Sequence, residues 1–213
     1  SSIGGKVAIN LDGVKNIIGA FYQPKMVLID PDTLSTLPRR HYANGLVEAL
    51  KAGLIYDESL FALFEQGDAI ADIELIITKA LHVKKAVVEQ DEKEHGLRKI
   101  LNFGHTIGHA IESSNHLHDY YHGECVAFGM LYFIRDEAIK QRVISVYKKL
   151  GLPRNIPMEC EKWLEMIQND KKADGDLVET IWVDSIGTAH IRPMHLEEIK
   201  RLMEDKRLIH VFF

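Results

Sequence analysis

The spacing of apolar residues constrains the fold more than any other feature of this chain. From about residue 37 onward they recur at steps of three and four, as Leu46, Leu50, Gly53 and Leu54 do, and Pro38 suits a first helical turn. Asp57 can cap the next helix and Gly67 can end it. Further helices are predicted over residues 57–67, 71–95, 97–114, 122–142, 143–151, 157–170 and 195–208. The chain is therefore predicted to be mainly α-helical.

Signals for strands lie towards the two ends of the chain. Residues 1–36 are rich in glycine and β-branched residues, and the apolar run KMVLID at 25–30, which Pro31 ends, predicts a buried strand. Near the other end, residues 177–192 contain the turn signal SIG and predict a small hairpin. We therefore divide the chain into a strand-bearing region, 1–36, and a helical domain, 37–213.

Composition argues against several kinds of partner. The 213 residues carry a net charge of −5 and a pI near 6.1, and no basic tract with aromatic residues indicates nucleic acid. No apolar run approaches the roughly 20 residues that cross a bilayer, and no signal-peptide pattern is present, so no membrane partner is expected. The two cysteines, Cys125 and Cys160, give no disulfide framework, which favours a reduced, cytoplasmic setting.

Two histidines stand four residues apart in the stretch LNFGHTIGHAIES. On a helix, His105 and His109 share a face with about 5–6 Å between their Cβ atoms, so both imidazoles could reach one ion. His122 opens the next predicted helix and can fold back to meet them. Imidazole suits Zn²⁺ or Co²⁺, and a catalytic zinc usually has three protein ligands and one open position. A carboxylate could complete the set, and the candidates are Glu48, Glu112 and Glu124.

The alternative is that these histidines form a surface or hydrogen-bonded pair without a metal. The stretch lacks the glutamate that HExxH places beside its first histidine, so spacing alone favours this plainer interpretation. Gly104 and Gly108 argue the other way. Each glycine costs about 1 kcal/mol in a helix interior relative to alanine, so the close approach of another element or a ligand is a reasonable motive for both.

Cationic side chains form a second group of candidates. The candidates are scattered along the sequence: Lys6, Lys15, Lys51, Lys84, Arg98, Lys171 and Lys172. Several of them fall beside glycines or on mostly apolar helix faces. Lys51 follows Glu48 by three residues, so the two share a helix face. Taken singly, each cation is more readily interpreted as a solvated side chain whose stem covers apolar surface. A cluster of them would suit a substrate with phosphate and carboxylate groups.

Five segments, in this order, resemble the 3-dehydroquinate synthase family: SSIGGKVAIN, GVKNIIGAFYQPKMVLID, LPRRHYANGLVEALKAGLI, VKKAVVEQDEKEHGLRKILNFGHTIGHAIE and HGECVAFGM. The similarity covers roughly residues 1–134 and continues more weakly through NDKKADGDLVETIWVDSIGTA. One such motif is modest support, whereas five in order are specific. The resemblance implies the helical C-terminal domain of the dehydroquinate synthase-like fold, in which an α/β domain precedes an all-α domain. Residues 1–36 would be the tail of the nucleotide-binding α/β domain.

The resemblance also implies an activity. The family consists of phosphate-eliminating carbon–oxygen lyases of the shikimate pathway, which leads to chorismate and the aromatic amino acids. Its members convert the sugar acid phosphate DAHP to 3-dehydroquinate and inorganic phosphate, with NAD⁺ and one divalent ion, usually zinc or cobalt. We therefore expect Zn²⁺ or Co²⁺, NAD⁺ and a small phosphorylated sugar acid as ligands, and a homodimer of the full-length protein.

Family roles carry over onto matching positions of this sequence. Glu48, His105 and His122 look like the three metal ligands, which changes the expected role of His109 to a partner of the substrate phosphate or of proton transfer. The other positions that match catalytic residues are Lys51, Lys84, Arg98 and Asn102, among which Lys84 and Arg98 look like the carboxylate clamp. The positions that match substrate-binding residues are Lys6, Lys15, Asn16 and one of Lys171 and Lys172.

The family has a nucleotide-binding domain before SSIGGK, which these 213 residues do not include. We therefore expect nearly all NAD⁺ contacts to lie elsewhere and KMVLID to be a strand without its sheet. The 213-residue chain by itself is expected to bind no NAD⁺ and to turn over no DAHP, although a metal site could persist. Consumption of DAHP by the purified chain with NAD⁺ would refute this expectation.

Three alternatives stay open. Another sugar phosphate cyclase, of the aminodehydroquinate or 2-deoxy-scyllo-inosose synthase type, would share the fold, but Lys84 and Arg98 favour a substrate carboxylate, which the inosose reaction lacks. A glycerol-type dehydrogenase usually has an aspartate early in its helical domain, where this chain has Glu48. The third alternative is a non-catalytic helical domain that binds partners, and it predicts no loss of zinc when Glu48, His105 or His122 is replaced.

Overall fold

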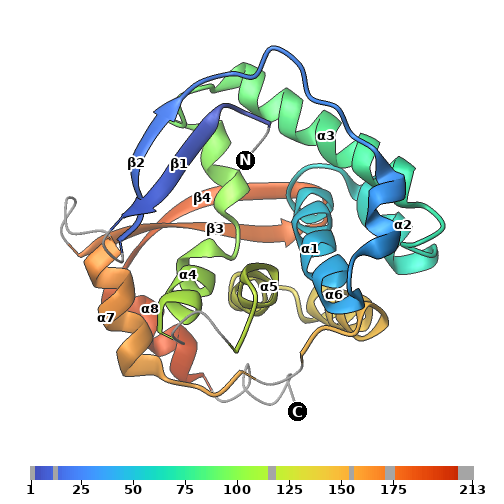
Figure 1. Cartoon of the computed structure of the whole chain (residues 1–213). Coiled ribbons are helices and arrows are strands. Elements are labelled where there is room, and N and C mark those ends of the chain that lie inside the picture. Colours follow the sequence, from blue (N-terminus) through green and yellow to red (C-terminus); the bar gives the residue numbers. More distant parts are fainter. Residues whose placement is uncertain (1–2, 12–13, 115–118, 154–155, 171–175, 206–213) are drawn as a thin grey trace.

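The computed structural model of the chain describes residues 3–11, 14–114, 119–153, 156–170 and 176–205. Helices dominate this part, so the predicted mainly helical fold class is confirmed (Figure 1). The α-helices are α1 Arg39–Ile55, α2 Glu58–Gln66, α3 Ile73–Gln90, α4 His105–Ser114, α5 His122–Tyr132, α6 Glu137–Leu150, α7 Cys160–Asp170 and α8 Leu196–Glu204. Two 3₁₀ helices join them, η1 Pro31–Thr36 and η2 Leu97–Asn102.

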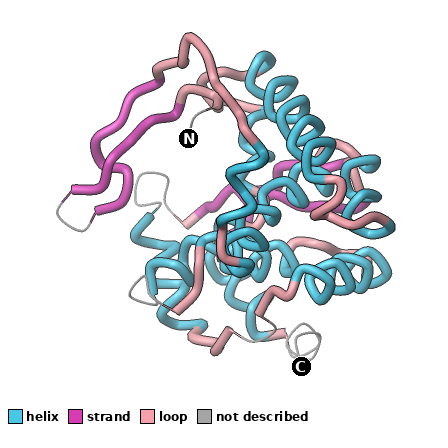
Figure 2. The backbone as a smooth tube through the Cα atoms, turned by 45° about the vertical axis from the view of Figure 1, so that its right-hand side comes forward, coloured by secondary structure: helices cyan, strands magenta, loops and turns pink. Residues whose placement is uncertain are grey.

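The strands form two separate antiparallel hairpins. The first joins β1 Lys6–Leu11 to β2 Val14–Phe21, and it projects at one side of the molecule (Figure 2). The second joins β3 Leu177–Ser185 to β4 Thr188–His195, with Ile181 opposite Ile191. This second hairpin turns at the predicted SIG and confirms that prediction.

Helix α5 lies at the centre of the helical domain (Figure 1). Every residue from 123 to 132 is buried, because this helix is apolar on all sides and a helix of that kind needs neighbours all round. Helices α1 and α4 pack against it directly, and α7 packs on α4. The rings of Phe128 and the fully buried Trp163 meet edge to face with centroids 6.0 Å apart. The core therefore places the beginning of α5 beside both α1 and α4.

Helix ends follow local capping chemistry where the sequence predicts it. The carboxylate of Asp57 accepts hydrogen bonds from the N–H groups of Ser59 (2.9 Å) and Leu60 (3.2 Å), and Gly67 follows the last residue of α2. Asp136 caps α6 in the same way, through Ala138 N at 2.7 Å. This second cap corrects a prediction: the break lies at residues 133–136, so 137–150 is one helix and no break separates 142 from 143.

The prediction of one helix over residues 97–114 is wrong. The 3₁₀ helix η2 ends at Asn102, and Gly104 then takes a left-handed backbone conformation with φ +77° before α4 begins at His105. Glycine adopts this conformation without the steric penalty of a Cβ atom. The turn gives His105 the first position of a new helix, whose direction is independent of η2.

The prediction of a buried strand over residues 25–30 is also wrong. This segment is extended but unpaired in the described structure, and Met26 and Leu28 are 73% and 84% exposed. A strand needs a neighbour to satisfy its backbone hydrogen bonds, and none of the described strands lies against this one. The apolar pattern alone does not supply that neighbour.

Two simpler observations complete the fold. Cys125 and Cys160 are both free thiols. Among the described helices, none combines the length and the apolar character that a membrane crossing requires.

The ion pair between α2 and α6 generates a pH-dependent prediction. Arg142 donates from Nε and Nη2 to the two carboxylate oxygens of Glu65, at 2.6 and 2.9 Å, and these hydrogen bonds hold the pKa of Glu65 below its ordinary value. Because the folded-state pKa is lowered, the pair stabilises the fold above the unfolded pKa of about 4.3, and this contribution is lost as the pH falls further. Arg142 is 43% exposed, so solvent screening limits the effect to about 1 kcal/mol or less.

The variant Glu65→Gln should therefore lower the free energy of unfolding at pH 7 by up to about 1 kcal/mol. Urea unfolding of the variant and the parent at pH 7 and at about pH 3.5 measures this difference. The difference should shrink at the lower pH. A difference that is constant with pH would contradict the assignment of the effect to this carboxylate.

Candidate metal and substrate site

Four side chains from three helices converge at one place. Glu48 comes from the middle of α1, His105 and His109 from the first two turns of α4, and His122 from the first residue of α5. The Oε1 atom of Glu48 lies 3.9 Å from Nε2 of His105 and 3.7 Å from Nε2 of His122. The three histidines also offer ring nitrogens that lie within 4.8 Å of one another. The structure therefore brings together all the predicted metal ligands and His109 as well.

Hydrogen bonds fix which nitrogen two of these histidines present. Nδ1 of His105 lies 3.1 Å from the carbonyl oxygen of Phe103, and Nδ1 of His122 lies 3.0 Å from a carboxylate oxygen of Glu112. Both partners are acceptors, so Nδ1 carries the proton when the ring is neutral and Nε2 keeps its lone pair. Those two Nε2 atoms are the ones that face Glu48.

The three candidate carboxylates take different places. Glu48 faces the Nε2 atoms, whereas Glu112 contacts the opposite nitrogen of His122. Glu124 is buried and forms an ion pair with Arg40, with Nε to Oε1 at 2.7 Å. Glu48 is thus the carboxylate that the geometry favours as a ligand, and Glu112 orients the histidine.

The surroundings of the cluster keep Glu48 ionised and His105 neutral, so both can donate an electron pair to a metal ion. Burial alone would raise the pKa of Glu48, but the charge of Lys51 and the contact with His122 outweigh it, so the net pKa lies far below the ordinary range. Burial, aided by the charge of Lys51, lowers the pKa of His105 well below its ordinary value. The hydrogen bond to Glu112, with the nearby carboxylate of Glu48, raises the pKa of His122 to about 9 when no metal ion is bound. Proton and cation therefore compete for His122.

The donor set fits a zinc- or cobalt-type ion. Metal–ligand bonds of about 2.0–2.2 Å in a tetrahedron place neighbouring donor atoms roughly 3.4 Å apart. The separations of 3.7 and 3.9 Å around Glu48 Oε1 are within a few tenths of an ångström of that spacing. One carboxylate and two neutral imidazoles form a common ligand set of catalytic zinc.

Glycines at the crossing of α4 and α5 create this convergence. A Cβ atom on Gly129 would lie 2.2 Å from the carbonyl oxygen of Gly104 and 2.9 Å from the nitrogen of Gly108. A Cβ atom on Gly108 would lie 3.0 Å from Cα of Val126. The sequence-based motive for Gly104 and Gly108, the close approach of another element, is thus confirmed, and that element is α5.

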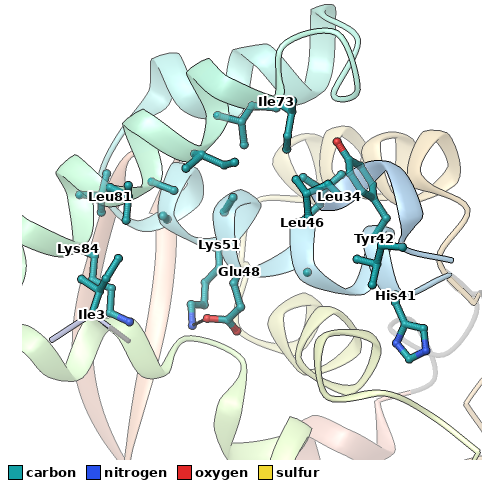
Figure 3. A pocket seen from close by; sticks show the side chains of 18 of the residues that line it. Ile3, Leu34, His41, Tyr42, Leu46, Glu48, Lys51, Ile73, Leu81 and Lys84 are labelled. Carbon is teal, nitrogen blue, oxygen red and sulfur yellow. Dashed lines mark hydrogen bonds and ion pairs between the residues drawn. The ribbon is translucent and has the colours of Figure 1, made fainter. Parts of the chain in front are cut away.

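Two lysines, Lys51 and Lys84, line a mostly apolar hollow of about 410 Å³ beside Glu48. Figure 3 shows Lys51 and Glu48 side by side at one end, with Lys84 and Ile3 nearby and an apolar wall that includes Leu46, Ile73 and Leu81. The buried Lys51 donates to Glu48 Oε2 at 2.8 Å. Burial and the like charges of Lys51 and Arg98 lower the pKa of Lys84, although Glu48 opposes this. A cationic group in such surroundings gains from an anionic ligand.

The N-terminal loop closes over the same cations. Arg98 is buried, and its Nη2 donates to the carbonyl oxygen of Gly4 at 2.7 Å while Nη1 donates to the carbonyl of Glu92. Lys6, the first residue of β1, pairs with Glu94. Burial, with the charges of Arg98 and Lys84, lowers the pKa of Lys6. Residues 4–6 and the helical domain therefore share one charged cluster.

A second hollow, of about 320 Å³, adjoins the histidines. Its lining includes Asn102, His105 and His109, and Asn102 donates to Glu94 at 2.8 Å. Glu94 holds its backbone at φ +63°, an uncommon conformation for a residue other than glycine. The second hollow thus borders the predicted metal ligand His105 together with two predicted catalytic residues, His109 and Asn102.

Some predicted residues are not placed by the structure. Lys171 and Lys172 lie outside the described residues. Lys15 and Asn16 belong to strand β2, but their side chains are also outside the described part.

Three contributors escaped the sequence analysis. Glu94 contacts two predicted residues, and its only local signal is a position among charged loop residues. Arg40 and Asn44 precede Glu48 by eight and four residues, so they lie on the same stripe of α1. That i, i+4, i+8 polar spacing is visible in the sequence and could have directed attention to them.

Comparison with known proteins is consistent across the chain. The family described as 3-dehydroquinate synthase C-terminal matches residues 45–173, and the one described as 3-dehydroquinate synthase N-terminal matches residues 1–44. The 3-dehydroquinate synthase of Thermoanaerobacter pseudethanolicus is 42% identical over 96% of this chain, which spans 62% of that protein. The enzyme of the same name from Picosynechococcus is 42% identical over 88% of the chain, which spans 56% of it.

Two solved structures of similar fold are synthases that differ from 3-dehydroquinate synthase in name. A 2-epi-5-epi-valiolone synthase from Streptomyces hygroscopicus, with NAD⁺ and Zn²⁺ bound, aligns with a TM-score of 0.83 and 26% identity over 98% of this chain and 62% of its own. A 2-deoxy-scyllo-inosose synthase complexed with carbaglucose-6-phosphate, NAD⁺ and Co²⁺ aligns with a TM-score of 0.81 and 26% identity over 94% of this chain and 61% of its own.

The glycine contact between α4 and α5 generates a stability prediction. Gly129→Ala should lower the free energy of unfolding by about 3 kcal/mol, because its methyl group would overlap the backbone of α4. Gly45→Ala is the matched control: Gly45 is also inside a helix, and a Cβ atom there meets nothing within 4 Å. The control should raise stability by up to about 1 kcal/mol. Urea unfolding of both variants tests this, and equal effects would contradict it.

Proposed function

The chain belongs to the 3-dehydroquinate synthase family, and on that premise we propose that it supplies the metal- and substrate-binding part of an enzyme that converts DAHP to 3-dehydroquinate and inorganic phosphate. The convergence of Glu48, His105 and His122 beside buried cations supports this proposal. Residues 37–213 would be the helical catalytic domain and residues 1–36 the end of a nucleotide-binding domain. Because the chain spans 62% of a relative's length, the activity is proposed for the protein that contains it.

We propose Glu48 Oε1 and the Nε2 atoms of His105 and His122 as the ligands of a Zn²⁺ or Co²⁺ ion. When bound, such an ion would act as a Lewis acid towards substrate hydroxyl groups. Glu112 holds His122 in the tautomer that presents Nε2, and the carbonyl of Phe103 does the same for His105. Lys51 holds the second oxygen of Glu48 and keeps that carboxylate ionised.

The cations would hold the two anionic groups of the substrate. We assign the substrate carboxylate to Lys84 and Arg98, and the substrate phosphate to Lys6 and, by the family resemblance, to Asn16. Charge-assisted hydrogen bonds at both ends of a small molecule fix its orientation, which is a large part of catalysis in an elimination of this kind. NAD⁺, which is bound in two of the similar structures, would be held chiefly by residues outside this chain.

His109 has a separate proposed role. Its ring lies 4.9 Å from that of His105, centroid to centroid, so it borders the ligand set and also the second hollow. We assign it to the substrate phosphate or to proton transfer, with Asn102 as a further substrate contact. A histidine in that role should be dispensable for metal binding but needed for turnover.

A sugar phosphate cyclase with a different substrate is the rival proposal. The two similar structures are named as a valiolone synthase and an inosose synthase, and each is 26% identical to this chain. The dehydroquinate synthase of Thermoanaerobacter pseudethanolicus is 42% identical to it. Lys84 and Arg98 favour a substrate that carries a carboxylate. The tests below separate the two.

The first test measures metal on the 213-residue chain. The parent should bind one equivalent of zinc, and Glu48→Gln, His105→Gln and His122→Gln should each lose most of it, because each removes one of three ligands. His109→Gln is the matched control and should keep its zinc. Metal analysis after dialysis gives the answer. Full zinc content in all three ligand variants would contradict the proposed site and favour a non-catalytic domain.

The second test measures phosphate release by the complete protein. DAHP with NAD⁺ should release phosphate, whereas glucose 6-phosphate, which has no carboxylate, should not. Lys84→Gln should raise KM for DAHP by about 10- to 100-fold, which corresponds to the loss of one charged hydrogen bond. Release from glucose 6-phosphate with none from DAHP would establish the rival instead.

A further inference from the structure

We propose that Arg40 and Asn44 are positioning residues for His122: they fix the first turn of α5 on α1 so that the histidine meets Glu48. This inference rests on the proposed function, because it concerns one of the proposed metal ligands. Neither residue touches the candidate metal position itself. Both act through the helix that carries the ligand.

Helix α1 presents three polar residues to the beginning of α5, one turn apart. Steps of four residues keep them on one stripe of the helix. Their partners are consecutive residues of α5 in the reverse order: Arg40 with Glu124, Asn44 with Gly123 and Glu48 with His122. The contact between the proposed ligands is thus the last step of a three-step ladder, and the other two steps set its register.

The first step is a forked ion pair between the half-exposed Arg40 and the buried Glu124. Arg40 donates from Nε and Nη2 to the two carboxylate oxygens of Glu124 at 2.7 and 2.8 Å, and the Glu124 side chain is 1% exposed. The same carboxylate accepts from the backbone N–H of Tyr121 at 2.9 Å. The guanidinium of Arg40 lies 4.4 Å from the centre of the Tyr121 ring, and His41 stacks on that ring with the same centroid distance. A planar fork holds its partner in one orientation, which a lysine cannot do.

The second step joins a side chain of α1 to the backbone of α5. Gly123 donates its N–H to Oδ1 of Asn44 at 2.6 Å. This N–H belongs to the first turn of α5, where backbone donors have no partner within the helix. A Cβ atom on Gly123 would lie 2.2 Å from the carbonyl oxygen of Asn44, so the two backbones are nearly in contact. His122, the residue before Gly123, is therefore held at a fixed distance from α1.

This distance decides whether one ion can reach both helices. Nε2 of His122 lies 3.7 Å from Oε1 of Glu48, and metal–ligand bonds are only about 2 Å long. A shift of α5 by about 1 Å would take the imidazole out of reach or distort the ligand geometry. The histidine can rotate about its own side chain, but the Glu112 contact restricts that rotation.

The experiment compares cobalt binding by variants of this chain. Arg40→Gln and Asn44→Ala should each weaken Co²⁺ binding by about 10- to 100-fold, measured by competition with a chelator, as loss of a supporting residue does in other metal sites. The visible absorption of bound Co²⁺ should also change in position or intensity, since it reports ligand geometry. Asn44→Asp keeps the acceptor oxygen and should restore most of the affinity and the parental spectrum.

Arg142→Gln is the matched control. This variant breaks the forked pair that Arg142 on α6 forms with Glu65 on α2. Neither of these residues belongs to the ladder between α1 and α5. It should lower stability to unfolding but leave cobalt affinity and spectrum unchanged. If Arg40→Gln does not fold, Arg40→Lys, which keeps the charge without the fork, replaces it and should give intermediate affinity.

The outcomes separate the two proposals. If the parent binds cobalt and the Arg40 and Asn44 variants match Arg142→Gln in affinity and spectrum, the positioning role is overturned and the metal site stands. If the parent itself binds no cobalt, the proposed metal site is overturned, and the positioning role falls with it. Weaker binding and an altered spectrum in both ladder variants, with the control unchanged, is the result we expect.

Discussion

The approach of α4 and α5 at three glycines is the constraint on which the rest of the structure depends. Gly104, Gly108 and Gly129 bring the two backbones together where any other side chain would force them apart. His105 and His109 begin one of these helices and His122 begins the other. Helix separation in proteins is usually 8–10 Å and is set by the side chains at the contact, so only the smallest residues let short imidazoles from both helices meet. The convergence of the histidines therefore depends on the lack of a Cβ atom at Gly104, Gly108 and Gly129.

A second constraint is the balance of charge in a confined space. Lys51 and Arg98 are buried, and the burial of the neighbouring Lys84, together with their charges, lowers the pKa of Lys84. Glu48 offsets part of this, through Lys51, but a metal ion would claim that carboxylate as well. A bound metal ion would thus compete with Lys51 and Lys84 for the negative charge of Glu48. Such a site is complementary to a molecule with two anionic groups, which agrees with a sugar acid phosphate.

The features that could be predicted from the sequence are those set by residues close together along the chain, such as helix caps and turns. Asp57 and Gly67 bound α2 as capping chemistry requires, and SIG turns the second hairpin. Prediction failed where distant residues decide: Gly104 ends η2 because α5 packs on it, and residues 25–30 remain unpaired because no described strand lies beside them. The predicted ligands Glu48, His105 and His122 do converge, but the family resemblance selected them. Spacing alone favours a histidine pair without a metal and leaves the choice of carboxylate open. Arg40 and Glu124 are 84 residues apart, so only the folded chain pairs them.

The bond from Arg98 to the carbonyl of Gly4 ties the first hairpin to the charged hollow. The ion pair between Lys6 and Glu94 is a second attachment of the same hairpin to the helical domain. A ligand that displaces either contact would therefore also change how the hairpin is held. An anion that drew the Arg98 guanidinium away from Gly4 would remove this hydrogen bond and loosen the loop. Coupling of this kind is reciprocal: the free energy by which an anion shifts the hairpin equals the free energy by which a shift of the hairpin changes the affinity for that anion. The position of the loop at Gly4 would thus be coupled to the binding of an anion at Arg98.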